Sequence, residues 1–142
     1  MQFQELLGKT LTKVEVNREK NEIHFFDTCS IEYVMRHFRE CCESVSIEDI
    51  NGDLNDLIGS PILRTIESAG TNHGEKEDYL DIESYTWTFY TLATIKGFVD
   101  LRWYGSSREF YSEKVDFYKI SSFENQMNFL TLFSDNHSFS YN

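Results

Sequence analysis

Residues 84–105 read SYTWTFYTLATIKGFVDLRWYG and carry the strongest strand signal in the chain. Large apolar side chains recur at every second position on both sides of Gly97, as in two strands that each bury one face. Gly97 marks the turn between them, so the stretch predicts an antiparallel hairpin. Tyr104–Ser107 then turns the chain toward a third strand at Phe110–Phe117, which extends the hairpin into a meander.

The chain before this hairpin predicts further short strands and one short helix. Alternation on both sides of the polar turn Asn17–Asn21 indicates a second hairpin. Within 49–58, Asp53 is a candidate N-cap for a short helix that ends at Gly59. One expected strand, at 30–38, also fits a helical period, and we favour the strand. The expected strands are Thr10–Val16, Glu22–Phe26, Ser30–Phe38, Cys41–Ile47 and Pro61–Glu67.

Two segments have a different character. Ala69–Glu83 is rich in carboxylates, shows no periodicity and is expected to be a solvated loop. Ser121–Asn142 is rich in serine and asparagine, with enough apolar residues for one short amphipathic helix docked on the body or on a neighbour. We therefore predict a compact α+β fold that is mainly an antiparallel β-meander with one or two short helices. A single ligand-binding domain would span residues 1–120, with a C-terminal extension at 121–142.

Length and charge exclude several classes of function. The chain has 142 residues, enough for one domain, and a formal net charge of -11. Such a surface repels long nucleic acid, whereas a small anion stays possible because a buried arginine pair outweighs salt-screened surface carboxylates. No apolar run approaches the roughly 18 residues of a membrane helix, and no export signal is visible. We expect a soluble cytosolic protein.

The side chains that usually carry metal or nucleophilic chemistry form no recognised motif. His37 with Cys41 and Cys42 is the densest group of soft ligands, but adjacent cysteines point to opposite faces of a strand. Because the cysteines are three in number and two are neighbours, we expect reduced thiols and no disulfide framework. The histidines stand beside no nucleophile motif. The sequence therefore predicts no metal, no cofactor and no catalytic residue.

Arginines and aromatic rings gather near the second turn of the meander. Ring faces stack on a nucleobase for about 1–3 kcal/mol each, and guanidinium forks bind phosphate oxygens in pairs. This combination is what an adenine nucleotide requires. The alternative is that alternation buries Trp103 in the core and leaves Arg102 in solvent, paired with Asp100 or Glu113. The candidate ligand-binding residues are Arg64, Phe89, Arg102, Trp103, Tyr104 and Arg108.

Several short motifs give the chain a resemblance to a known family. They are Ile47–Ile50, Gly52–Leu54, Asp56–Ile62, Ser84–Tyr90, Ala93–Gly97 and Leu101–Gly105. Together they resemble a small group of phage and bacterial domains and, within it, the first Thoeris anti-defence family. The resemblance runs from about Leu7 to Ile120.

The resemblance implies a sponge for a nucleotide signal. Proteins of that family bind the cyclic ADP-ribose isomers made by the TIR enzyme of a bacterial Thoeris system and do not degrade them. It also implies a compact homo-oligomer that holds the ligand where protomers meet, in the cytoplasm of an infected bacterium. Arg64, Phe89 and Arg102 match the family's binding positions. Relatives often have Asn-Gly where this chain has Arg108 and Glu109.

The leading expectation is therefore a binding protein, with two competitors of other classes. Its guanidinium groups, from Arg64, Arg102 and Arg108, would meet the pyrophosphate, and an aromatic ring, from Phe89, Trp103 or Tyr104, would meet the adenine. One competitor is a nucleotide-signal hydrolase that uses Glu48, Asp49 or Asp53 with a divalent metal. These carboxylates also suit the start of the expected helix. The other competitor is a protein-interaction inhibitor of a host factor.

Overall fold

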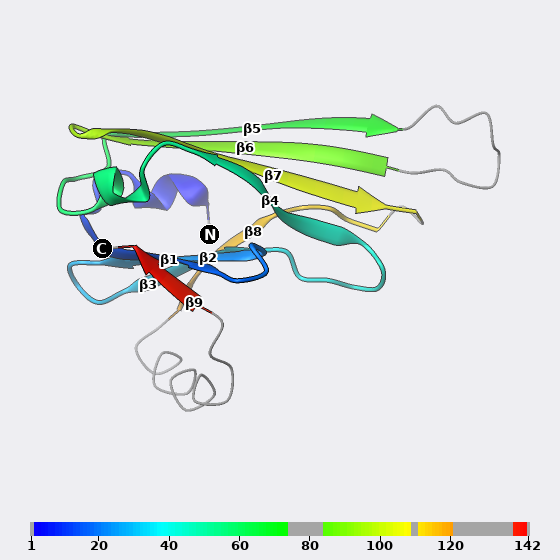
Figure 1. The fold of residues 1–142 in the computed structure, drawn as a ribbon, viewed down its shortest axis with the longest axis horizontal. Coiled ribbons are helices and arrows are strands. Elements are labelled where there is room, and N and C mark those ends of the chain that lie inside the picture. The colour runs from blue at the N-terminus through cyan, green and yellow to red at the C-terminus, as the bar shows by residue number, and fades with distance from the viewer. Residues whose placement is uncertain (1, 74–83, 109–110, 121–137, 142) are drawn as a thin grey trace.

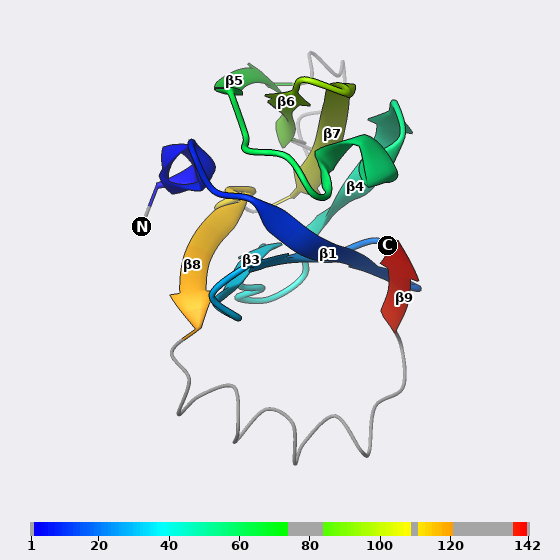
Figure 2. The same cartoon turned by 90° about the vertical axis from the view of Figure 1, so that its left-hand side faces the viewer.

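A computed structural model describes residues 2–73, 84–108, 111–120 and 138–141, and it arranges them as two antiparallel sheets in two layers (Figures 1 and 2). One sheet has the strand order β8-β3-β2-β1-β9 and the other β4-β7-β6-β5. The elements are η1 (Phe3–Leu6), β1 (Leu11–Asn17), β2 (Glu22–Asp27), β3 (Glu32–Arg36), β4 (Ser44–Asn51), η2 (Leu54–Leu57), β5 (Arg64–His73), β6 (Ser84–Thr94), β7 (Gly97–Ser107), β8 (Asp116–Ile120) and β9 (Ser138–Tyr141).

The two hairpins expected from alternation are both confirmed. β6 and β7 pair along their whole length, from Thr94 opposite Gly97 to Ser84 opposite Ser107. β1 and β2 pair across a turn that Asn17 organises, because its side-chain oxygen accepts hydrogen bonds from the amides of Asn21 and Glu22 at 2.9 and 3.0 Å. Asparagine favours turns because its side chain bonds to nearby backbone amides in this way.

The core lies between the two sheets. Val14 and Phe25 face inward from the five-stranded sheet, and Leu101 faces inward from the four-stranded sheet; all three are fully buried. Phe3 of η1 packs edge-on against this core, with its ring centroid 4.8 Å from that of Tyr90. Side chains alternate between the two sides of a strand. The side chains of β6 and β7 that do not fill the core therefore point outward.

The expected antiparallel sheet structure is confirmed, but the fold is closer to all-β than to the expected α+β class. The predicted helix is a four-residue 3₁₀ turn, η2, because β4 continues through Asn51 and leaves too few residues for an α-helix. The expected cap is confirmed: the Asp53 carboxylate accepts from the Asn55 amide at 2.9 Å. None of the described helices is long and apolar enough to cross a membrane.

Three segments differ from the expected meander. β5 continues to His73, past the expected start of a loop at Ala69, because these residues find backbone partners along β6. The strand after β7 is Asp116–Ile120, and it pairs with β3 in the other sheet. β9 pairs with β1 and so adds the last described residues to the five-stranded sheet. The helix predicted in the tail falls largely on 121–137, outside the described residues.

Candidate functional site

The outer side of the four-stranded sheet carries most of the aromatic residues that the sequence singles out. The register of β6 and β7 places Phe89 opposite Arg102, and Trp87 opposite Tyr104. Cross-strand partners project to the same side of a sheet, so these side chains share one surface. Tyr85 stands two residues before Trp87 and belongs to the same side. We call this set, Tyr85, Trp87, Phe89, Arg102 and Tyr104, the aromatic face.

The rings of the aromatic face form a cluster. Tyr85 and Trp87 have centroids 6.4 Å apart and planes inclined by 27°, and Tyr85 and Tyr104 are 6.0 Å apart at 26°. Trp87 and Tyr104 are closest, at 5.1 Å. Phe89 is 40% exposed and continues the row toward Arg102. The chain therefore presents a platform of flat rings with partly accessible faces, and such a platform is suited to stacking.

Arg102 is the guanidinium group of this face, and it is held by one weak contact. Its Nη2 lies 3.3 Å from Oε1 of Glu48, and both side chains are more than 40% exposed. Glu48 reaches it because the ladder of β4 and β7 shifts register between Ile47 and Asp49, a bulge of the kind that re-aims a side chain. Arg102 Nε is buried and has no hydrogen-bond partner among the described residues.

The three arginines of the predicted site do not converge within one chain. Arg64 pairs with Ala93 on β6 and so lies on the same side of the sheet as the aromatic face. Ala93 stands four residues after Phe89, which corresponds to about 13 Å along the strand. Arg108 lies beyond the last β6–β7 pair, six residues from Arg102, which corresponds to about 20 Å of extended chain. Of the six candidates, the register of the described strands places Phe89, Arg102 and Tyr104 next to one another.

Trp103 does not join these residues. It is 1% exposed and packs in the core, because alternation along β7 turns it away from its neighbours Arg102 and Tyr104. The alternative interpretation from the sequence is therefore right for Trp103, but wrong about the partner of Arg102. Asp100 accepts from the Thr91 hydroxyl at 2.5 Å, and Glu113 accepts from Ser107 at 3.0 Å inside the protein.

Sequence reasoning also misses Tyr85 as a member of the face and Glu48 as the counter-ion of Arg102. The alternation along β6 is the signal that identifies Tyr85, because this residue lies two positions before Trp87 and therefore on the same side as Trp87 and Phe89. Glu48 leaves no such signal, because an extra residue in a strand is not visible in the pattern of apolar positions.

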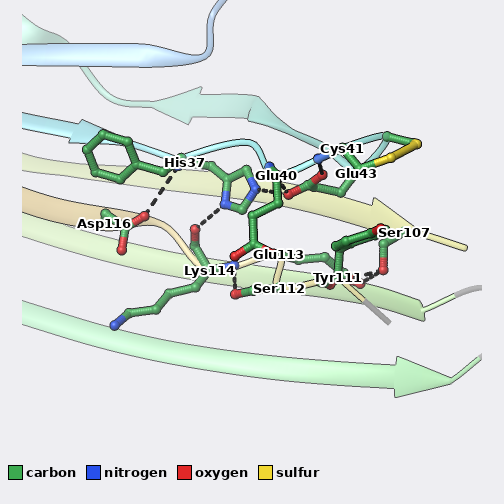
Figure 3. Close-up of polar contacts among 12 residues, drawn as sticks. His37, Glu40, Cys41, Glu43, Ser107, Tyr111, Ser112, Glu113, Lys114 and Asp116 are labelled. Atoms are coloured by element: carbon green, nitrogen blue, oxygen red, sulfur yellow. Dashed lines mark hydrogen bonds and ion pairs between the residues drawn. A yellow bond between two sulfur atoms is a disulfide. The ribbon is translucent and has the colours of Figure 1, made fainter. Parts of the chain in front are cut away.

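A second polar cluster, which the sequence does not indicate, surrounds the buried carboxylate of Glu43 (Figure 3). It accepts from the amides of Glu40 and Cys41 and contacts His37 Nε2, each at 2.8 Å. The hydrogen bond from the Glu40 amide, together with those from His37 and Cys41, lowers the pKa of Glu43 to about 2 despite burial. His37 Nδ1 also contacts the Lys114 carbonyl oxygen at 2.7 Å, so both of its ring nitrogens are engaged.

A third cluster lies on the five-stranded sheet around His24. Its Nδ1 is 2.5 Å from Glu32 Oε1 and its Nε2 is 3.3 Å from Glu22 Oε1. Burial by itself disfavours the charged ring, but the hydrogen bonds and charges of the two carboxylates outweigh it and raise the pKa of His24 to about 9. The protonated ring therefore joins β2 to β3 at neutral pH.

This cluster predicts a loss of stability in mild alkali. The folded-state pKa of His24 lies above its ordinary value of 6.5, so the contribution is complete below pH 6.5 and disappears as the pH rises through about 9. We expect the free energy of unfolding to fall by about 1–3 kcal/mol more in the wild type than in His24→Gln between pH 6 and pH 9.5. Urea unfolding at both pH values measures this, and parallel losses in the two proteins would contradict it.

The remaining candidates for metal or nucleophilic chemistry have other roles in the structure. Within the described ranges, no group of three or more His, Cys, Asp or Glu side chains is placed to hold a metal ion. Cys41 and Cys42 are joined by a disulfide, so the expectation of reduced thiols is wrong for this pair, whereas Cys29 is free and exposed. Adjacent cysteines can bond here because they sit in a loop, where the outward alternation of a strand does not apply.

Comparison with known proteins places the chain in a family without an assigned activity. No curated protein matches it, and no solved structure does. Residues 4–117 match a family described as a domain of unknown function, DUF7448. This match begins within η1, ends within β8 and includes every residue of the aromatic face. The match covers well over half of the 142 residues, and the chain belongs to the DUF7448 family.

Proposed function

We propose that this protein binds a cyclic ADP-ribose-type nucleotide on the aromatic face and holds it without cleaving it. The observation that carries the proposal is the cluster of Tyr85, Trp87 and Tyr104 rings on the same side of the sheet as Arg102. The biological setting comes from the sequence resemblance alone: a phage protein that sequesters the signal of a bacterial Thoeris system in the cytoplasm of the infected cell.

The energetics of such a complex are favourable. A base stacked on an aromatic side chain gains about 1–3 kcal/mol. The exposed contact of Arg102 with Glu48 is worth less than about 1 kcal/mol, so a phosphate group replaces the carboxylate at little cost. A phosphate that engages Nε and Nη2 together, after the side chain turns its buried Nε outward, also satisfies this donor in the paired geometry that guanidinium and oxyanion prefer.

A second copy of the chain completes the site in this proposal. A pyrophosphate carries two negative groups, and the aromatic face as defined contains one arginine, Arg102. Along the sheet, Arg64 lies about 13 Å from the position of Phe89 and Arg108 about 20 Å from Arg102. Homo-oligomers that bring one of these arginines over the aromatic face of a partner would supply the second guanidinium. Burial between copies would also strengthen the charge contacts and slow release, which a sponge requires.

The contacts of the other polar groups favour binding over hydrolysis. His24 and His37 each engage both ring nitrogens, so neither offers a free base to activate water. Glu48 lies against Arg102, and Asp53 caps η2. Two of the three carboxylates of the hydrolase alternative therefore already have structural partners.

Recovery of the ligand tests the proposal. The purified protein is mixed with cyclic ADP-ribose isomers, freed of excess nucleotide by filtration, heated, and the released material is identified by mass spectrometry. We expect intact nucleotide in stoichiometric amount. Recovery of ADP-ribose would instead assign the chain to the hydrolase class. Absence of any retained nucleotide would contradict the proposal, and a stoichiometric host protein in a pulldown would then favour the interaction inhibitor.

A further inference from the structure

The loop between β3 and β4 carries a pair of sulfur atoms at the protein surface. Cys41 and Cys42 are neighbours in sequence, both are exposed, and they are bonded to each other. Exposed sulfur atoms are accessible to other thiols, and accessibility is one requirement for thiol–disulfide exchange. Cys29 provides an internal comparison, since it is exposed on the turn after β2 and is free.

The backbone beside the sulfur pair is held by Glu43. This carboxylate is buried directly before β4, and it accepts hydrogen bonds from the amides of Glu40 and Cys41. It also contacts His37, which reaches the Lys114 carbonyl oxygen on the segment before β8. Figure 3 shows the sulfur pair next to this network. Cys41 is therefore both a sulfur partner and an amide donor to the carboxylate that organises the loop.

The same loop forms part of the wall of a surface hollow. The hollow has a volume of about 490 Å³, and the loop contributes His37, Phe38, Arg39 and Glu43 to its lining. Arg36 lines it from the end of β3. A change in the loop backbone therefore alters a cavity large enough for a small molecule.

We propose that Cys41–Cys42 is a redox modification site, opened and closed by exchange with low-molecular-weight thiols and disulfides, that sets the order of the loop around Glu43. In the first step a thiolate attacks one cysteine sulfur and forms a mixed disulfide, and the other cysteine leaves as a thiolate. A second thiol then attacks the mixed disulfide. Two molecules of thiol are consumed, and the products are two cysteine thiols and one small disulfide.

Opening the bridge has a local structural consequence. In the oxidised form the peptide unit between the two cysteines is part of a closed ring. This ring restricts the backbone at Cys41, directly after the Cys41 amide. In the reduced form this restriction is gone, and the hydrogen bonds to Glu43 remain to hold the backbone at Glu40 and Cys41. The amides of Glu40 and Cys41 should then open more often to solvent.

Amide exchange under defined redox conditions tests this inference on the full chain. The protein is equilibrated in glutathione buffers of different thiol-to-disulfide ratio, alkylated to count thiols by mass spectrometry, and examined in parallel by hydrogen exchange. We expect the pair to change state within the series, and the Glu40 and Cys41 amides to exchange about tenfold faster in the reduced form. A pair that stays in one state at every ratio, or equal exchange rates in both states, would overturn the inference.

Two variants separate this site from general effects of the buffers. Cys29→Ser removes the third thiol and should leave the transition of the pair and the two exchange rates unchanged. The double variant Cys41→Ser, Cys42→Ser should show the fast rates in every buffer. A redox response that persists in the double variant would assign the effect to another part of the chain. The outcome does not depend on nucleotide binding, so the inference and the proposed function fail separately.

Discussion

Replacement of Trp103 by alanine is expected to lower the free energy of unfolding by about 3–5 kcal/mol. The indole is 1% exposed and lies between the two sheets, so its removal leaves a cavity that the surrounding strands cannot close. Phenylalanine should cost less, about 1–2 kcal/mol, because it keeps most of the ring volume. The Trp103→Phe substitution also removes the indole N–H, a buried donor that has no partner among the described residues.

Urea unfolding of matched variants measures this effect. Trp87→Ala is the control, because Trp87 lies on the neighbouring strand but on the outer side, where its ring contacts Tyr85 and Tyr104. Loss of these contacts should cost only about 1 kcal/mol. Equal losses in the two alanine variants would mean that the core does not lie on the side of the sheet where the structure puts it.

This contrast shows what alternation along a strand can and cannot predict. The period of β7 is enough to separate Trp103 from Arg102, because adjacent residues of a strand point to opposite sides. The period does not say which side is inward, so the sequence leaves both assignments open. The structure chooses between them through the neighbouring strand, where Tyr90 and Leu92 supply the other half of the core.

Local turns are predictable from the sequence and distant pairings are not. The turn before Gly97 and the Asn17 turn each join strands that are adjacent in sequence, so composition and period suffice. The pairing of β8 with β3, and of β9 with β1, joins strands far apart in the chain. Nothing in the period of Asp116–Ile120 distinguishes a strand beside β7 from one in the opposite sheet.

The candidate site is likewise predictable where it depends on one hairpin, and not where it depends on pairing between distant strands. The sequence singles out both Phe89 and Arg102, and their place on one surface follows from the hairpin register once the turn is placed. The separation of Arg64 from Arg102 follows from the register of β5 on β6, which the sequence does not specify. The Glu43 cluster leaves no signal, because the partners of this carboxylate are two amides of its own loop and a histidine that the sequence suggests only as a metal ligand.

Replacement of Arg102 by alanine is expected to weaken binding of a cyclic ADP-ribose isomer by about 2–4 kcal/mol, because a phosphate held between copies loses a charged partner. The fold should survive, since the side chain is 42% exposed and its contact with Glu48 contributes less than about 1 kcal/mol. Calorimetric titration measures the affinity. Arg36→Ala is the matched control, because it removes an arginine from the other sheet and should leave the affinity unchanged.

The counter-ion of Arg102 provides the sharper half of this test. Glu48→Gln removes the carboxylate that competes with phosphate for the guanidinium, so binding should stay equal or tighten by up to about fivefold. A hydrolase that uses Glu48 predicts a different readout: the wild type would cleave the nucleotide and Glu48→Gln would not, whereas the binding proposal predicts intact nucleotide with both proteins. Loss of binding in a folded Glu48→Gln would contradict the replacement of this carboxylate by phosphate, and unchanged binding in a folded Arg102→Ala would remove Arg102 from the site. Weaker binding in Arg102→Ala together with equal or tighter binding in Glu48→Gln is the result expected if an anion takes the place of Glu48 beside Arg102.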